Sequence, residues 1–180
     1  MRIAPFLVAG MLVLALAGCV PSGGHGKASP SASATPVFSS DAEALKAAEA
    51  AYAAYLRVSD QILIDGGVNP ERLEAVTSSL LYAQELKGFQ ETHSRGWYST
   101  GGTTFDHFAL QSYNPDDPES LVVAYVCSDV SQVDVLDSSG NSVVSSTRPN
   151  RAPFEVTFAL SRPSHLVLAR NDVWTGQGVC

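Results

Sequence analysis

The sequence predicts an α+β fold in which three helices pack on a mostly antiparallel sheet of four to six strands. Three observations lead to this prediction. Apolar residues recur every three to four positions between residues 40 and 96, they alternate with polar residues after Gly101 and Gly102, and clusters of Pro, Gly and Asn divide the remainder into short segments. Helices followed by an antiparallel sheet are typical of the α+β class.

The first helix is expected from Ser40 to about Ile64. Ser40 and Glu43 have the spacing of a capping box, in which each residue satisfies a backbone amide left free at the helix start. Gly66 and Gly67 follow and are expected to end the helix. The face expected to point to the core carries Leu45, Ala48, Tyr52, Tyr55, Ser59 and Ile62.

Two further helices are expected before the sheet. An Asn-Pro pair predicts a short helix over residues 69–76, with Asn69 as its N-cap. Thr77 or Ser78 offers the cap of a third helix, which is expected to close at Arg95 and Gly96. The expected buried face of that helix carries Tyr82, Leu86, Phe89 and His93.

The strands are separated by turn-forming residues. Alternation of Phe154, Val156, Phe158 and Leu160 with smaller or polar residues predicts a sheet with one apolar face, which the helices are expected to cover. Two of the strands are expected to form a hairpin around Ser139, Gly140 and Asn141. The expected strands are 104–113, 120–128, 132–136, 142–146, 153–160 and 165–174.

The first residues are expected to be a lipoprotein leader. Arg2 gives a positive start, an uncharged apolar run extends from Ile3 to Leu16, and the small residues Ala17 and Gly18 precede Cys19. The run is shorter than the ~20 residues of a transmembrane helix. Since Leu-Ala-Gly-Cys has the pattern of a lipobox, we expect a diacylglycerol on Cys19; the alternative is a secreted protein with an unmodified Cys19.

The chain is expected to divide into a signal peptide over 1–18, the lipidated Cys19 with a disordered tether over 19–39, and a folded domain over 40–180. The tether is rich in Gly, Ser, Ala and Pro and has few apolar side chains to bury. Two acyl chains suffice for stable attachment, so the expected partner is the cell membrane and the expected location its extracytoplasmic face. The net charge of −7 argues against nucleic acid as a partner.

The remaining cysteines, Cys127 and Cys180, are expected to form a disulfide. Thiols outside the cytoplasm oxidise, and the two residues are an even pair once Cys19 carries lipid. A zinc site or a catalytic thiol is the alternative. Neither Cys has another Cys or His at ligand spacing, and a nucleophile needs an activating base beside it. No cofactor or metal is expected.

Five short segments of the chain carry a resemblance to a known family. They are AEAAYAAYL from Ala48, NPERLEAV from Asn69, Leu86-Lys87-Gly88-Phe89, VVAYVCS from Val122 and Val173-Trp174-Thr175-Gly176. With these segments the chain resembles actinobacterial lipoproteins whose folded part is similar to the nuclear transport factor two superfamily. The resemblance implies a cone of three helices against a curved sheet over about 40–180. It implies no particular chemistry, because that cone hosts isomerases, dehydratases, transport adaptors and interaction modules.

An enzyme built on this cone would place acid and base groups inside it. The candidates for such a pocket are Tyr52, Tyr55, Asp60 and His107, with His93 and Asp106 as further groups. Asp106 and His107 are neighbours on an expected strand, so they are expected to point to opposite faces. The alternative is structural: core tyrosines with satisfied hydroxyls, Asp60 on the solvated side or at a helix end, and a surface His107.

The sequence therefore favours a membrane-anchored cell-envelope lipoprotein whose folded domain is a non-catalytic binding module for a protein partner or a small apolar ligand. No catalytic residue is assigned, because the chain lacks a Gly-rich phosphate loop, an HExxH motif and a GxSxG elbow. The alternatives are a cone-cavity enzyme of isomerase or dehydratase type and an accessory subunit of an envelope complex.

Overall fold

The computed structural model describes residues 36–162 and 165–180. The expected leader, Cys19 and most of the expected tether lie outside these residues. The helical elements are α1 (Asp41–Ile64), the 3-10 helix η1 (Pro70–Ala75) and α2 (Ser79–Ser94). The strands are β1 (Tyr98–Thr100), β2 (Thr104–Tyr113), β3 (Val122–Asp129), β4 (Asp134–Leu136), β5 (Arg151–Arg162) and β6 (His165–Val173).

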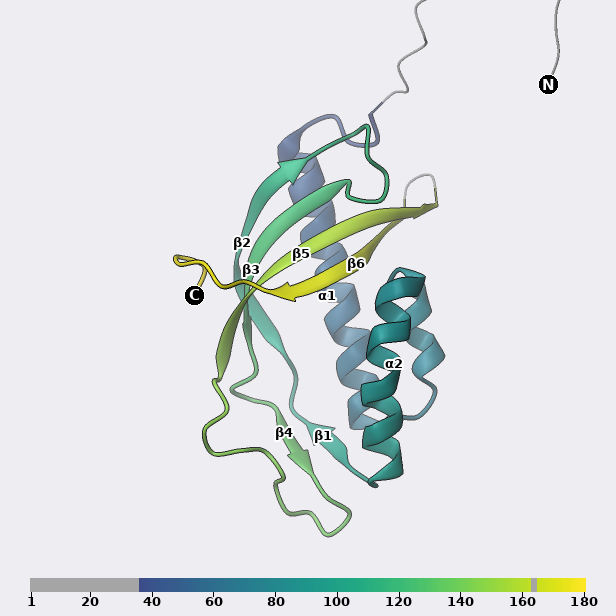
Figure 1. Cartoon of the computed structure of the whole chain (residues 1–180), viewed down its shortest axis with the longest axis vertical. Coiled ribbons are helices and arrows are strands. Elements are labelled where there is room, and N and C mark those ends of the chain that lie inside the picture. Colours follow the sequence, from purple (N-terminus) through teal and green to yellow (C-terminus); the bar gives the residue numbers. More distant parts are fainter. Residues whose placement is uncertain (1–35, 163–164) are drawn as a thin grey trace, which may run out of the picture. The chain divides into compact units, whose positions relative to one another are not determined.

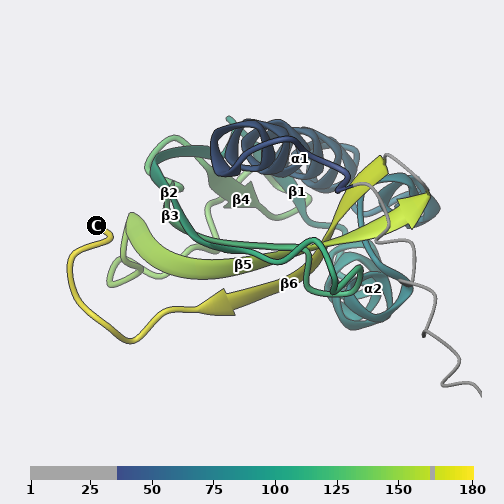
Figure 2. The ribbon, with the colours of Figure 1, turned by 90° about the horizontal axis from the view of Figure 1, so that it is seen from above.

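Helices packed on a mostly antiparallel sheet confirm the expected α+β class. Four strands form one sheet in the order β2-β3-β5-β6, and β1 pairs with β4 in a separate two-stranded sheet. Figure 1 shows α1 behind the four-stranded sheet, and Figure 2 shows that the sheet curves and that α1 lies across one of its faces. The helix α2 packs beside the edge strand β6.

The edge strand β6 is covered by the segment between η1 and α2. Leu168 N donates to Val76 O at 3.0 Å, and Ser78 N donates to Leu168 O at 2.8 Å. These bonds form a parallel bridge between Thr77 and Leu168. The segment therefore satisfies part of the edge of β6 and fixes the start of α2 against the sheet.

The start of α1 agrees with the prediction, apart from one contact of the capping box. Ser40 is the N-cap, and its Oγ accepts a hydrogen bond from Glu43 N at 3.2 Å. The Glu43 carboxylate returns to the preceding residue, where it accepts from Ser39 N at 2.8 Å and from the Ser39 hydroxyl at 2.5 Å. The helix ends at Ile64, and Gly66 and Gly67 adopt positive φ angles of 73° and 76°.

The second helical segment differs from the expectation in its cap. Asn69 precedes Pro70 as predicted, but it has a left-handed φ of 52° and its side chain makes no capping hydrogen bond. Six residues form a 3-10 helix. Its hydrogen-bond geometry suits a short connector, which here leads from the end of α1 to the edge of the sheet.

The buried face of α2 is narrower than the sequence predicts. Ser78 caps the helix as expected, accepting from Leu81 N at 3.2 Å. Leu81 and Phe89 are buried, whereas His93 is exposed. The prediction for His93 was wrong because α2 packs at the edge of the sheet, which covers only one stripe of the helix.

The expected strand over 142–146 does not form. The segment pairs with β4 through an isolated bridge between Leu136 and Ser142 and a hydrogen bond from Val143 N to Val135 O at 2.9 Å. The Asp137 carboxylate accepts hydrogen bonds from the backbone amides of the turn between them. The partner of β4 is β1, with Ser99 opposite Val135. A three-residue strand carries too little alternation to be recognised in the sequence.

Candidate functional site

The predicted pocket residues Tyr52 and Tyr55 lie in the hydrophobic core between α1 and the sheet. Tyr52 is 1% exposed and Tyr55 is 5% exposed. The Tyr52 ring is 5.1 Å from the Phe105 ring and 5.9 Å from the Phe108 ring, and the Phe108 ring lies 6.3 Å from the Phe158 ring. Aromatic rings therefore fill the space around Tyr52 where a cone cavity was considered.

A half-buried hydrogen bond beside these rings joins the two long helices. Tyr55 Oη donates a 2.6 Å hydrogen bond to Glu85 Oε1. Burial raises the pKa of Glu85, although the Tyr55 hydroxyl opposes this effect. Burial, followed by the charge of Glu85, raises the pKa of Tyr55 far above its usual range, and burial raises that of Tyr52 to about 12. These tyrosines therefore stay protonated at neutral pH.

Asn171 of β6 adds a polar side chain next to Tyr55, and it acts to lower the pKa of that hydroxyl. Asn171 Oδ1 is buried without a hydrogen-bond partner among the described residues. Such an orphaned carbonyl costs about 1–3 kcal/mol. The sequence reasoning missed both Glu85 and Asn171. A signal existed for Glu85, which lies four residues from Leu81 and from Phe89 on the buried stripe.

Asp60 holds the loop that leads into β2. Its Oδ2 accepts from Thr103 N at 2.7 Å, and its Oδ1 accepts from the Thr103 hydroxyl at 2.8 Å. The carboxylate is half-buried. Both oxygens are therefore used in joining α1 to the loop before β2, whereas the sequence offered a solvated side chain or a helix-end cap as the alternative for Asp60; Asp60 lies within α1 and caps neither of its ends.

The expectation that Asp106 and His107 point to opposite faces was wrong. His107 Nδ1 lies 2.6 Å from Asp106 Oδ1, and both side chains are exposed. The register of β2 against β3 shifts between Asp106 and Ala109, and His107 adopts a left-handed φ of 52°. This bulge cancels the alternation of the strand and turns both side chains to solvent. His107 does not join Tyr52, Tyr55 or Asp60.

Arg151 of β5 forms ion pairs with Asp106 of β2 and Asp129 of β3, and so links three strands. Its Nη2 donates to Asp106 Oδ1 at 2.6 Å, and its Nη1 donates to Asp129 Oδ2 at 3.0 Å. The guanidinium holds the pKa of Asp106 below its usual range; for Asp129, hydrogen bonds from Ser131 contribute most to a shift in the same direction. Arg151 Nη2 also lies 3.1 Å from the Sγ of Cys127.

Cys127 is joined to Cys180 by a disulfide, with a Cα to Cα distance of 5.2 Å. Cys127 is fully buried, and it alternates with core residues of β3 so that it lies on the face opposite α1. On the same face, the Trp174 ring stacks 4.7 Å from the Tyr125 ring. The disulfide therefore ties the residues that follow β6 back to β3.

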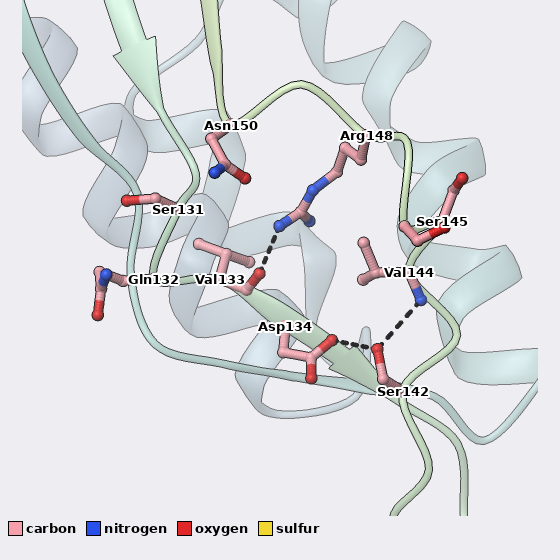
Figure 3. Close-up of a pocket in the computed structure, with 10 residues that line it drawn as sticks. Ser131, Gln132, Val133, Asp134, Ser142, Val144, Ser145, Arg148 and Asn150 are labelled. Atoms are coloured by element: carbon pink, nitrogen blue, oxygen red, sulfur yellow. Dashed lines mark hydrogen bonds between the residues drawn. The ribbon is translucent and has the colours of Figure 1, made fainter.

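A polar cleft of about 370 Å³ lies among the loops on both sides of β4. Figure 3 shows the guanidinium of Arg148 pointing into it, toward Val133. The lining is mostly hydroxyl and amide groups, with one carboxylate and one guanidinium. Its members are Ser131, Gln132, Val133, Asp134, Ser142, Val144, Ser145, Ser146, Arg148 and Asn150.

Arg148 is held in this cleft by backbone carbonyls. Its Nη2 donates to Val133 O at 2.6 Å and to Val130 O at 3.1 Å. Its Nε is buried and has no hydrogen-bond partner in the described part of the chain, where no carboxylate lies within 4.0 Å of the guanidinium. Sequence reasoning missed this cleft, because most of its residues come from two loops without regular structure.

No protein family model matches the chain, and no curated protein matches it. Among residues 36–162 and 165–180, three or more His, Cys, Asp or Glu side chains do not gather in a group able to hold a metal ion. That same part of the chain contains no helix with the length and apolar character needed to cross a membrane.

Proposed function

We propose that the protein is a cell-envelope lipoprotein, anchored through a diacylglycerol on Cys19, whose folded domain is a non-catalytic binding module. The observation that carries the binding role is the aromatic packing around Tyr52. Because the rings of Phe105 and Phe108 occupy the space beside it, a substrate has no room there. The proposed module therefore binds its ligand or protein partner at the surface of the domain.

The fold proposed for the domain is the cone of the nuclear transport factor two superfamily. A long helix across one face of a curved sheet, a short helical connector and a second helix at the sheet edge support this assignment. The antiparallel order β2-β3-β5-β6 is also compatible with it. The family resemblance remains a proposal about descent and adds no chemistry to the site.

One observation favours the alternative of an interior enzyme. The buried Tyr55 and the half-buried Glu85, whose pKa is raised, form an acid pair of the kind that proton-transfer sites use. An isomerase or dehydratase of this type needs a cavity that opens beside Tyr55. The third possibility, an accessory subunit of an envelope complex, is a special case of the binding module.

The lipoprotein role is tested by mass spectrometry of the mature chain and by its distribution between membrane and soluble fractions. Expressed in a bacterium that processes lipoproteins, the chain is expected in the membrane fraction with a diacylglycerol on an N-terminal Cys19. A Cys19→Ser variant is expected to leave the membrane fraction. An unmodified Cys19, or an unchanged distribution of the variant, would refute the anchor.

The experiment for the binding role compares the structure of the full chain before and after soaking with small carbonyl compounds. Soaking with small carbonyl compounds is expected to leave the space beside Tyr52 and Tyr55 closed. If such a compound instead occupies a cavity that contacts Tyr55 and Glu85, the enzyme alternative replaces the binding module.

A further inference from the structure

We propose that the cleft around Arg148 binds an oxyanion carried on a polyol, such as the carboxylate of a sugar acid or the phosphoryl group of a sugar phosphate. The inference rests on the proposed binding role and names the ligand class for that role. It is carried by the geometry of the loops on both sides of β4 (Figure 3).

The first argument is the charge of Arg148. Arg151 is neutralised by Asp106 and Asp129, whereas the guanidinium of Arg148 meets only the carbonyl oxygens of Val130 and Val133 within the described residues. A partly buried cation without a counter-ion is costly. An oxyanion in the cleft supplies that counter-ion and accepts charge-assisted hydrogen bonds, which are about twice as strong as neutral ones.

The second argument is the lining around the cation. Four serine hydroxyls and two side-chain amides border the cleft, and each of these groups both donates and accepts hydrogen bonds. Such groups match the hydroxyls of a polyol. Val133 and Val144 are the only apolar residues of the lining, so this cleft suits a polar ligand better than the apolar one considered from the sequence.

The third argument is Asp134, which lies in the same cleft. Its Oδ1 accepts from Val135 N at 2.8 Å and from the Ser142 hydroxyl at 2.6 Å. Its Oδ2 accepts no hydrogen bond from the described residues and is free to accept one from a ligand hydroxyl. A carboxylate and a guanidinium that line one cleft without pairing select a ligand that carries hydroxyls and an oxyanion on different atoms.

The cleft is also held in place before any ligand arrives. Val130 N donates to Asn150 O at 2.8 Å, and Arg148 N donates to Ser145 O at 3.0 Å. The first bond and the Arg148 side chain tie the two loops to each other, and the second closes a turn within the loop that follows β4. Binding to such a pre-formed site costs less ordering entropy. The volume of about 370 Å³ lies at the small end of ligand sites and suits a single sugar unit.

The test is a titration of the ¹⁵N-labelled, lipidated full chain in detergent, followed by amide chemical shifts at pH 7 and low salt. The probes are glucuronate, glucose 6-phosphate and glucose. Saturable shifts confined to residues 130–150 are expected with one or both charged sugars. Glucose is expected to bind at least about tenfold more weakly, because it offers no partner for the cation.

Two variants locate the binding. Arg148→Gln removes the cation, and Ser146→Asp keeps Arg148 but supplies a competing carboxylate at the rim; each is expected to weaken binding at least about tenfold. Ser112→Asp is the matched control, because it makes the same charge change on exposed β2 and should leave binding unchanged. Unaltered amide shifts outside the loops establish that each variant is folded.

The outcomes separate the ligand sources. Binding of glucuronate alone indicates a carboxylate ligand, and binding of glucose 6-phosphate alone indicates a phosphoryl ligand. The proposal is overturned if neither charged sugar saturates, if glucose binds equally well, or if Ser146→Asp binds as the unaltered chain does. The acyl mass on Cys19, measured on the same sample, reports separately on the lipoprotein role.

Discussion

The hydroxyl of Tyr55 on α1 donates a 2.6 Å hydrogen bond to Glu85 on α2 inside the domain. This contact joins the helix that covers the sheet to the helix that lies at its edge. It also gives the domain a half-buried carboxyl group whose protonation depends on folding.

The pKa of Glu85 is raised in the folded state, so its carboxyl contributes stability only when protonated. That contribution is fully present below the unfolded pKa of about 4.3 and is lost as the pH rises through the higher folded pKa. The free energy of unfolding, measured with urea, is therefore expected to include a contribution from Glu85 that falls as the pH rises across this range.

Glu85→Gln keeps an acceptor for Tyr55 without the titrating group. The stability difference between this variant and the unaltered chain is expected to shift in favour of the variant as the pH rises from 4 to 7. A difference that stays constant with pH would mean that Glu85 is not desolvated on folding.

The ion pairs of Arg151 predict that stability depends on pH in the opposite direction. The lowered pKa values of Asp106 and Asp129 mean that these carboxylates add stability above their unfolded pKa and lose it as the pH falls through the folded values. Arg151→Gln is expected to raise both values in a ¹³C NMR titration and to move acid unfolding to higher pH.

Asp137 is the internal control for that titration. Its pKa is lowered chiefly by hydrogen bonds from Asn141, and Arg151 plays no part in the shift. The pKa of Asp137 should therefore stay the same in Arg151→Gln. If Asp106 and Asp129 also keep their values, the ion pairs do not persist in solution.

Removal of the disulfide is expected to lower stability substantially. Cys127 and Cys180 are separated by 53 residues. The chain-entropy model assigns a loop of this length a contribution of about 4 kcal/mol. Urea unfolding of Cys127→Ala/Cys180→Ala should show this loss. A reductant should destabilise the unaltered chain by a similar amount and leave the double variant unaffected.

Two glycines predict opposite effects of the same substitution. A Cβ on Gly101 would meet Gln132 O at 1.8 Å, and its φ of 76° disfavours a side chain, so Gly101→Ala is expected to be strongly destabilising. A Cβ on Gly88 in α2 meets nothing within 4 Å. Gly88→Ala is expected to raise the free energy of unfolding by about 0.5–1 kcal/mol.

Thermal unfolding of these two variants checks the loop packing between β1 and β4. Equal melting temperatures for Gly101→Ala and the unaltered chain would mean that the segment around Gln132 moves away without cost. In that case the position of the Arg148 cleft beside this segment would also be in question.

Local sequence patterns determined most of the elements. Ser40 and Ser78 cap their helices because a hydroxyl at that position satisfies a free amide, and this requires only neighbouring residues. The strand β2 spans the predicted residues 104–113, since turn-forming residues bound it on both sides, with Gly101 and Gly102 before it and Asn114 and Pro115 after it. The apolar face of β5 was equally readable, with Val156 and Phe158 fully buried.

The tertiary structure alone decided the site. The side chains of Asp106 and His107 meet because a bulge turns His107 to a positive φ. The pKa of Glu85 is raised because packing against other elements half-buries its carboxyl group beside Tyr55. Arg148 lines a cleft because carbonyls of a distant loop hold it. Contacts between segments remote in the chain leave no periodic trace, whereas caps and alternation depend on neighbours.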